Sequence, residues 1–317
     1  MHFKTSFNIP HSDFDISYNT PVMMLGSCFA EHIGTRLQAA QLPVLTNPFG
    51  INYNPISIGD CINYLMNNDF FEEKHVFKNG DLWHSWLHHG RFSHPNKAEI
   101  LRGINTELSA ARAHFIKTKC LILTLGTANI FIEKESQTVV ANCHKVPPQY
   151  FEKKRLTVAE VIDYFKPIFK KIFSQNIDFQ IVMTVSPIRH LRDGLVENNR
   201  SKAVLLLACD ELSRFFPNVH YFPAYELVID DLRDYRFYAP DMMHPTEQAI
   251  AYIWEHFTAT FFSENTNQIV EEVQKINLMK QHRPLHPNTE GYQQFVKVLQ
   301  QKIDLLNHNY PFLSVKI

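Results

Sequence analysis

Two short motifs, far apart in the chain, hold residue types that can work together in catalysis. Residues 26–30 read Gly-Ser-Cys-Phe-Ala and directly follow the apolar run Val-Met-Met-Leu. Residues 241–245 read Asp-Met-Met-His-Pro. A serine hydroxyl becomes a useful nucleophile when a histidine removes its proton and a carboxylate orients that histidine. Ser27, His244 and Asp241 therefore supply the parts of an ester-type active site.

The local structure expected at each motif suits this chemistry. A strand that leads through a Gly-Ser turn into a helix exposes Ser27 and leaves the first helical N–H groups free to face an oxyanion. The three-residue spacing lets Asp241 accept the Nδ1–H of His244, which leaves Nε2 as the base. Each motif alone also fits a simple helix cap. Their joint occurrence favours the catalytic interpretation.

Two other groups compete for a chemical role. Cys28, beside the serine, is the more nucleophilic side chain, although its place at the helix start predicts a small inward-facing hydrophobe. Histidines at positions 84, 88, 89 and 94 lie beside two tryptophans, and the first two are spaced like metal ligands on one helix face. No Cys or acidic ligand has zinc-like spacing, so we prefer packing or pocket histidines and expect neither metal nor cofactor.

The composition excludes several classes of protein. The 317 residues carry a formal net charge of −1 and one compact basic cluster, so we expect no nucleic-acid partner. No apolar stretch approaches the roughly 20 residues that span a bilayer, so we expect no membrane partner. The five cysteines are scattered and odd in number, and the first residues lack a signal-peptide pattern. These features favour a reduced, cytoplasmic protein.

Strand and helix patterns alternate along most of the chain. Apolar runs predict buried strands, and amphipathic stretches or caps predict helices between them. The expected strands are 22–25, 121–125, 180–185 and 219–222, and the expected helices include 30–40, 107–117, 202–215 and 246–261. This alternation predicts a mainly parallel sheet covered on both faces. We expect one α/β domain over residues 1–262, with a loop-rich insertion or pocket wall at 50–100, and a helical extension at 263–317 packed on the body.

The sequence also resembles a known family in several blocks. Its first motif is the signature of the GSCFA family, a branch of the SGNH (GDSL-like) hydrolase superfamily, although it reads Gly-Ser-Cys where the superfamily has Gly-Asp-Ser. The resemblance covers roughly residues 20–262. Further blocks that resemble the family are 47–55, 124–127, 142–145, 186–190, 232–238 and 241–245. The resemblance implies a flavodoxin-like three-layer α/β/α sandwich, a catalytic serine in the first block and an Asp-x-x-His pair in the last.

Carried over residue by residue, the resemblance assigns Ser27 as the nucleophile, Asp241 as the orienting acid and His244 as the base. It implies an oxyanion hole built from the backbone N–H groups of Ser27 and Gly50 and from an asparagine amide. The superfamily pattern Gly-x-Asn-Asp is here Gly-Thr-Ala-Asn. We favour Asn129 for that amide, with Thr127 and Asn142 as alternatives. Candidate pocket residues that lie in or near these blocks are Thr127, Asn142, His144 and His190. His88 and His89, from the histidine-rich run, are two further pocket candidates.

These observations lead to one functional expectation and two alternatives. We expect a serine-dependent ester hydrolase or acyltransferase that removes a small O-acyl group, such as acetyl, through an acyl-enzyme. A small molecule or a glycan would carry the ester. The first alternative is a non-catalytic binding module on the same fold, motivated by the altered third block. The second is a metal-dependent hydrolase that uses the histidines of residues 84–94.

Overall fold

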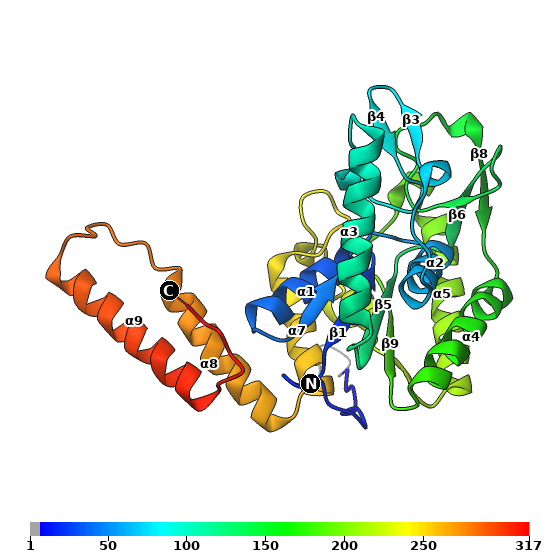
Figure 1. Ribbon diagram of the computed structural model, residues 1–317. Helices are drawn as coiled ribbons and strands as arrows, with labels where there is room; N and C mark the ends of the chain where they lie inside the picture. Colours follow the sequence, from blue (N-terminus) through cyan, green and yellow to red (C-terminus); the bar gives the residue numbers. More distant parts are fainter. Residues whose placement is uncertain (1–6, 317) are drawn as a thin grey trace.

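A five-stranded parallel sheet forms the centre of the molecule (Figure 1). The structure is a computed structural model that describes residues 7–316. In spatial order the strands are β10 (Val219–Tyr221), β9 (Gln180–Val185), β5 (Cys120–Leu125), β1 (Val22–Gly26) and β2 (Val44–Thr46). Every paired neighbour runs parallel. This is the flavodoxin-like order, so the predicted fold class is confirmed.

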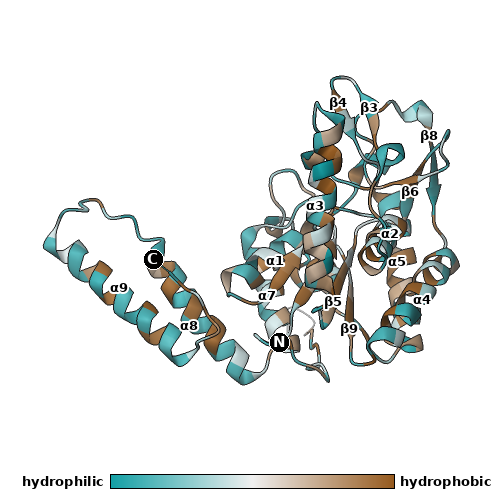
Figure 2. Ribbon diagram, viewed as in Figure 1, coloured by the Kyte–Doolittle hydropathy of each residue, from teal (hydrophilic) through white to brown (hydrophobic). Residues whose placement is uncertain are grey.

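Helices cover both faces of this sheet because strand side chains alternate between the two faces. Met23 and Leu25 face one buried cluster, whereas Val22 and Met24 face the other. The first face is covered by α2 (Pro55–Met66), α3 (Lys97–Phe115), α4 (Val158–Gln175) and α5 (Leu195–Phe215). The second is covered by α1 (Cys28–Ala39) and α7 (Glu247–Phe261). Figure 2 shows the apolar strands β5 and β9 between these helices.

Smaller elements gather beyond the carboxyl ends of the strands. An antiparallel sheet has the order β7-β6-β8, and β3 pairs with β4 as a hairpin. In Figure 1 both lie at the top of the view. Their bounds are β3 (Phe77–Asn79), β4 (Leu82–His84), β6 (Asn129–Glu133), β7 (Val139–Val140) and β8 (Phe151–Arg155). Short helical turns are Glu73–His75, Gly90–Phe92, Pro148–Tyr150, η4 (Leu191–Asp193), α6 (Ala224–Glu226), the π-helical Leu227–Leu232 and Tyr235–Phe237.

Residues 50–100 hold more regular structure than the loop-rich stretch expected. Helix α2 lies there because the Asn54 side chain accepts the N–H of Ser57 and Pro55 occupies the first helical turn. The start of α3 also lies there, capped by Asn96. The hairpin β3-β4 and two short helical turns complete this stretch, of which Tyr53 and Asn54 line the cavity described below.

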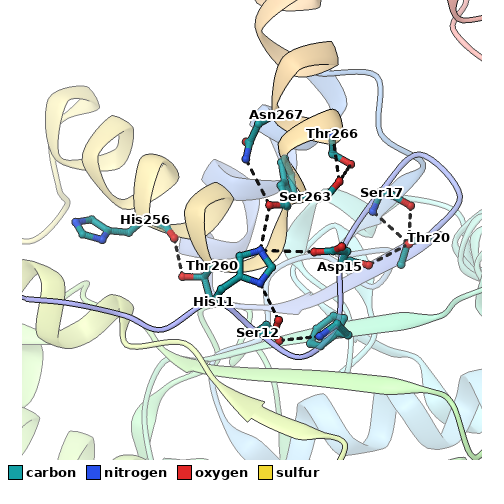
Figure 3. Close-up of polar contacts among 12 residues, drawn as sticks. His11, Ser12, Asp15, Ser17, Thr20, His256, Thr260, Ser263, Thr266 and Asn267 are labelled. Carbon is teal, nitrogen blue, oxygen red and sulfur yellow. Dashed lines mark hydrogen bonds and ion pairs between the residues drawn. The ribbon is translucent and has the colours of Figure 1, made fainter.

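The C-terminal helices form an antiparallel pair that extends to the left of the body in Figure 1. Helices α8 (Glu264–Lys280) and α9 (Glu290–Asn309) share an apolar cluster of their own. The N-terminal segment holds the junction of α7 and α8: His11 Nε2 lies 3.2 Å from the Phe262 carbonyl oxygen (Figure 3). Among the described residues, no helix combines the length and the apolar character that a bilayer span requires.

Candidate active site

The point where the sheet order reverses places β1 beside β5, and both strands end at the same edge. In open α/β sheets, ligands bind at such a switch point. Strand β1 ends at Gly26, whose φ is +145° and where a Cβ would lie 2.2 Å from the Thr124 carbonyl oxygen. The Gly26 N–H donates to Asn47 Oδ1 at 2.9 Å, and its carbonyl accepts the N–H of Asn52 at 3.0 Å. These contacts fix the turn that leads into α1.

Ser27 occupies the capping position of α1. Its Oγ accepts the N–H of Phe29 at 3.3 Å, and its own N–H donates to the Thr124 carbonyl oxygen at 3.0 Å. The residue is only 1% exposed and does not line the cavity described below. Within residues 7–316, no hydrogen bond joins Ser27 to His244. The structure therefore gives Ser27 the geometry of a helix cap, unlike the exposed hydroxyl expected from the sequence.

Cys28, the next residue, faces the histidine. Its Sγ lies 3.8 Å from Nε2 of His244, and the half-buried residue both packs against the apolar cluster and lines the cavity. Burial raises the pKa of the Cys28 thiol, whereas the N–H groups of the first turn of α1 and the Lys202 ammonium act in the opposite direction. The site thus brings a thiol, and not a hydroxyl, to the imidazole.

The pairing of Asp241 with His244 agrees with the spacing argument. Asp241 Oδ2 lies 2.6 Å from His244 Nδ1, while Oδ1 accepts the N–H groups of Met243 and His244 at 2.9 and 3.0 Å. These N–H groups and the imidazole lower the pKa of Asp241 to about 2. Met242 adopts the left-handed conformation, with φ of 58°, that closes the turn. The ionised carboxylate orients Nε2 toward Cys28.

A cavity of about 730 Å³ opens beside these side chains. Cys28 and His244 form part of its wall, with the 140–148 segment and the 188–193 segment around them. The predicted residues that line it are Thr127, Asn129, Asn142, His144 and His190. Of the other predicted residues, Ser27, Gly50, His88 and His89 lie outside the lining, and Asp241 contacts it only through His244.

The oxyanion-hole residues expected from the sequence are differently placed. The Gly50 N–H donates to the Asn47 carbonyl oxygen at 2.8 Å, and a Cβ on Gly50 would lie 2.2 Å from that of His89. The glycine therefore permits close packing against His89. Asn129 does reach the cavity, where its Nδ2 lies 3.4 Å from Asp193 Oδ2. Asn142 lines the same cavity, and its Oδ1 accepts the N–H of His144.

The histidine-rich segment packs internally. His88 Nδ1 lies 2.9 Å from Ser85 Oγ, and burial lowers the pKa of His88 to about 3. His144 Nε2 lies 2.8 Å from the Ser85 carbonyl oxygen, its ring is tilted by 36° against that of His84, and burial lowers the pKa of His144 to about 4. Among the described residues, no group of three or more His, Cys, Asp or Glu side chains could hold a metal ion. The metal alternative therefore lacks a ligand set in the described chain.

Lys202 is a buried residue of the site that sequence reasoning missed. It is 1% exposed, and its Nζ donates to the carbonyl oxygens of Gly126 and Ser186, both at 2.6 Å. These carbonyls follow the ends of β5 and β9, so the ammonium joins the two strand ends. Burial lowers its pKa to about 7. A lysine three residues before Leu205, on the inner face of α5, was the available signal.

Comparisons with known proteins identify a family for most of the chain. Residues 21–257 match the model of the GSCFA family, and residues 273–316 match that of the GSCFA domain protein, C-terminal domain. No curated protein sequence matches the chain. A solved structure, the acetyl xylan esterase Est2A from the rumen bacterium Butyrivibrio proteoclasticus, is similar with 11% identity and a TM-score of 0.39. The match covers 79% of this chain and 64% of that one, so the chain spans less than two thirds of the esterase.

Proposed function

The chain belongs to the GSCFA family, and from that premise we propose an SGNH-type ester hydrolase or acyltransferase that works through an acyl-enzyme. One observation carries the proposal. Cys28 Sγ, His244 Nε2 and Asp241 form a continuous series, with 3.8 Å between sulfur and nitrogen and 2.6 Å between imidazole and carboxylate. This is the nucleophile, base and orienting acid of covalent acyl transfer.

Cys28 is the nucleophile in this proposal, in place of the serine expected from the sequence. Cys28 lines the cavity and faces the base, whereas the Ser27 hydroxyl caps α1. The Gly-Asp-Ser pattern of the superfamily has its serine two residues after the glycine. Two residues after Gly26, this chain has Cys28. The motif alignment and the geometry thus support the same residue.

The reaction follows from these positions. His244 takes the proton of the Cys28 thiol, and the thiolate attacks the acyl carbonyl carbon. The Cys28 backbone N–H and the Asn129 amide stabilise the resulting oxyanion. The tetrahedral intermediate collapses as the bond to the leaving oxygen breaks, and His244 returns its proton to that oxygen. Water or an acceptor hydroxyl, deprotonated by His244, then attacks the thioester and releases the thiol.

The substrate in this proposal is a small O-acyl ester, such as an acetyl ester, on a small molecule or a glycan. Tyr53 and Phe131 line the cavity and offer flat apolar surfaces of the kind on which sugar rings pack. We assign the activity to the reduced cytoplasm. The cysteines of the described residues are all free thiols, and a reducing compartment keeps a nucleophilic thiol available.

Substitution of the two adjacent residues tests the proposal. Turnover of p-nitrophenyl acetate should fall at least 100-fold in Cys28→Ala and in His244→Ala, but by less than tenfold in Ser27→Ala. Cys143→Ala is the matched control, because Cys143 is a second free thiol in the same cavity. Mass spectrometry should find the acetyl group on the peptide that contains Cys28.

Two outcomes would contradict this assignment. Loss of turnover in a folded Ser27→Ala, with retention in Cys28→Ala, would return the role to the serine. A folded wild-type protein that neither turns over the ester nor becomes acetylated would support the binding-module alternative.

A further inference from the structure

The mouth of the cavity carries a positive charge that the acyl-transfer reaction above does not use. Lys145, Arg189 and Arg192 line the cavity, and among the described residues Asp193 is the one acidic residue in its lining. Asp193 is already paired with Lys153. The chain as a whole has a formal net charge of −1, so this local excess is not a general property of the surface.

Two of these three cations, Lys145 and Arg192, lack an internal partner within the described residues, whereas Arg189 has one. Arg189 lies over the ring of Tyr238, with 4.3 Å between the guanidinium carbon and the ring centroid. Lys145 and Arg192, in contrast, form no side-chain hydrogen bond or ion pair with any other residue in the range 7–316. Both are exposed at the mouth. Burial raises the pKa of the Cys143 thiol, two residues before Lys145, and the nearby Arg192 guanidinium acts in the opposite direction.

The backbone holds Lys145 in this position at a conformational cost. His144 and Lys145 are consecutive residues with φ of 48° and 61°, in the left-handed region. Such strain persists where surrounding contacts over-determine the backbone, and it clusters at binding sites. Here the His144 N–H donates to Asn142 Oδ1 at 2.9 Å, and its carbonyl accepts from Asn79 Nδ2 at 3.0 Å. The hairpin β3-β4 thus fixes the turn that presents the lysine.

Arg192 is held from the other side. It lies on η4, where the ion pair of Asp193 with Lys153 and the hydrogen bond from the His190 N–H to Asn198 Oδ1 fix the turn. The two cations therefore come from separately anchored segments that meet at one opening. A dianionic phosphate is well matched to two such cations, since lysine supplies a point charge and arginine a planar set of donors.

We infer that Lys145 and Arg192 bind a phosphate on the leaving group of the acyl donor, beside the proposed nucleophile Cys28. This inference rests on the proposed function for the identity of the reaction. The bond from the acyl carbon to the leaving oxygen or sulfur breaks as the bond to Cys28 Sγ forms. His244 passes the proton taken from the thiol to the departing atom.

The first test measures the charge at the mouth without any ester. Cys28 is alkylated with iodoacetate, which is anionic, and with iodoacetamide, which is neutral, and the ratio of the two rates is compared between variants. We expect the ratio to fall about threefold in Lys145→Gln and in Arg192→Gln, and about tenfold in the double variant. Lys302→Gln, an exposed lysine on α9, is the control. An unchanged ratio in the double variant would overturn the inference.

A second measurement does not depend on the thiol. Pyrophosphate should bind the wild-type protein in a calorimetric titration, and its affinity should fall at least tenfold in the double variant. Absence of binding to the wild type would refute the phosphate site. Binding with an inert Cys28 would instead leave the phosphate site in place and refute the nucleophile.

Two acyl donors distinguish whether the phosphate belongs to coenzyme A or to a sugar phosphate. Acetyl-coenzyme A and an acetylated sugar phosphate are compared with p-nitrophenyl acetate, which has no phosphate. For the phosphate-bearing donor that the wild-type protein turns over, kcat/KM should fall at least tenfold in the double variant. The kcat/KM for p-nitrophenyl acetate should change less than threefold. Equal losses for both kinds of substrate would contradict the inference.

Discussion

Burial of His88 makes a quantitative prediction about acid stability. Its ring lies between Phe49, Phe71 and Phe92, with centroid distances of 5.4, 4.7 and 5.2 Å, and burial lowers its pKa from 6.5 to about 3. Below pH 6.5 the unfolded chain therefore binds a proton that the folded chain does not. The free energy of unfolding consequently decreases as the pH is lowered. Lowering the pH from 7 to 5 reduces the free energy of unfolding by about 2 kcal/mol through this one residue.

Urea denaturation of the wild type and of His88→Phe at both pH values measures this contribution. Phenylalanine keeps an aromatic ring in the same apolar surroundings but cannot be protonated. The loss of unfolding free energy from pH 7 to pH 5 should be smaller in the variant by about 2 kcal/mol. His308→Phe, at an exposed position on α9, should show the wild-type loss. An equal loss in wild type and His88→Phe would refute the reasoning, because His88 would then titrate alike in the folded and unfolded states.

Three further predictions concern Asp241, Lys202 and Gly26. Asp241→Asn should lower the turnover of p-nitrophenyl acetate by about 10²- to 10⁴-fold, because the base loses its orienting carboxylate; a loss under threefold would contradict this. Lys202→Met should lower the free energy of unfolding by about 1–3 kcal/mol in urea denaturation, because the carbonyl oxygens of Gly126 and Ser186 lose their buried donor, and an unchanged free energy of unfolding would contradict this. Gly26→Ala should destabilise the fold by about 3 kcal/mol or more in urea denaturation, because its Cβ would meet a backbone carbonyl of β5 at 2.2 Å. Gly90→Ala, where a Cβ meets nothing within 4 Å, should be close to neutral, and similar losses in both variants would contradict the steric argument.

The central strands could be predicted because a parallel sheet buries both faces and so requires uninterrupted apolar runs. β1, β5 and β9 are such runs, and each lies within a residue or two of its predicted bounds. The edge strand β2 is three residues long and half-buried, so its pattern is too short to detect. β8 reads Phe-Glu-Lys-Lys-Arg with only its first residue buried, which is indistinguishable from a charged loop.

At the site too, local sequence spacing predicts some features, and contacts between distant residues decide the others. The pairing of Asp241 with His244 spans three residues, so the spacing alone predicts their hydrogen bond. Whether Ser27 or Cys28 faces the base depends on the direction in which the chain leaves Gly26. That direction is set by contacts with the distant residues at the end of β5 and in the loop after β2. Sequence spacing cannot supply those contacts, so the expected turn favoured Ser27, whereas the structure places Cys28 opposite the imidazole.

The structure gives each position of the Gly-Ser-Cys-Phe-Ala motif a separate physical role. Gly26 permits a backbone contact with β5 that a Cβ would block. Ser27 caps α1, which is worth about 1 kcal/mol, and its N–H ties the turn to the same strand. Phe29 and Ala30 are 1% and 0% exposed and anchor the helix in the core. Cys28 is the partly exposed member, and it faces His244. Four positions therefore hold the turn in place, and the fifth, Cys28, is the one whose side chain is free to face the imidazole, as the proposed mechanism requires.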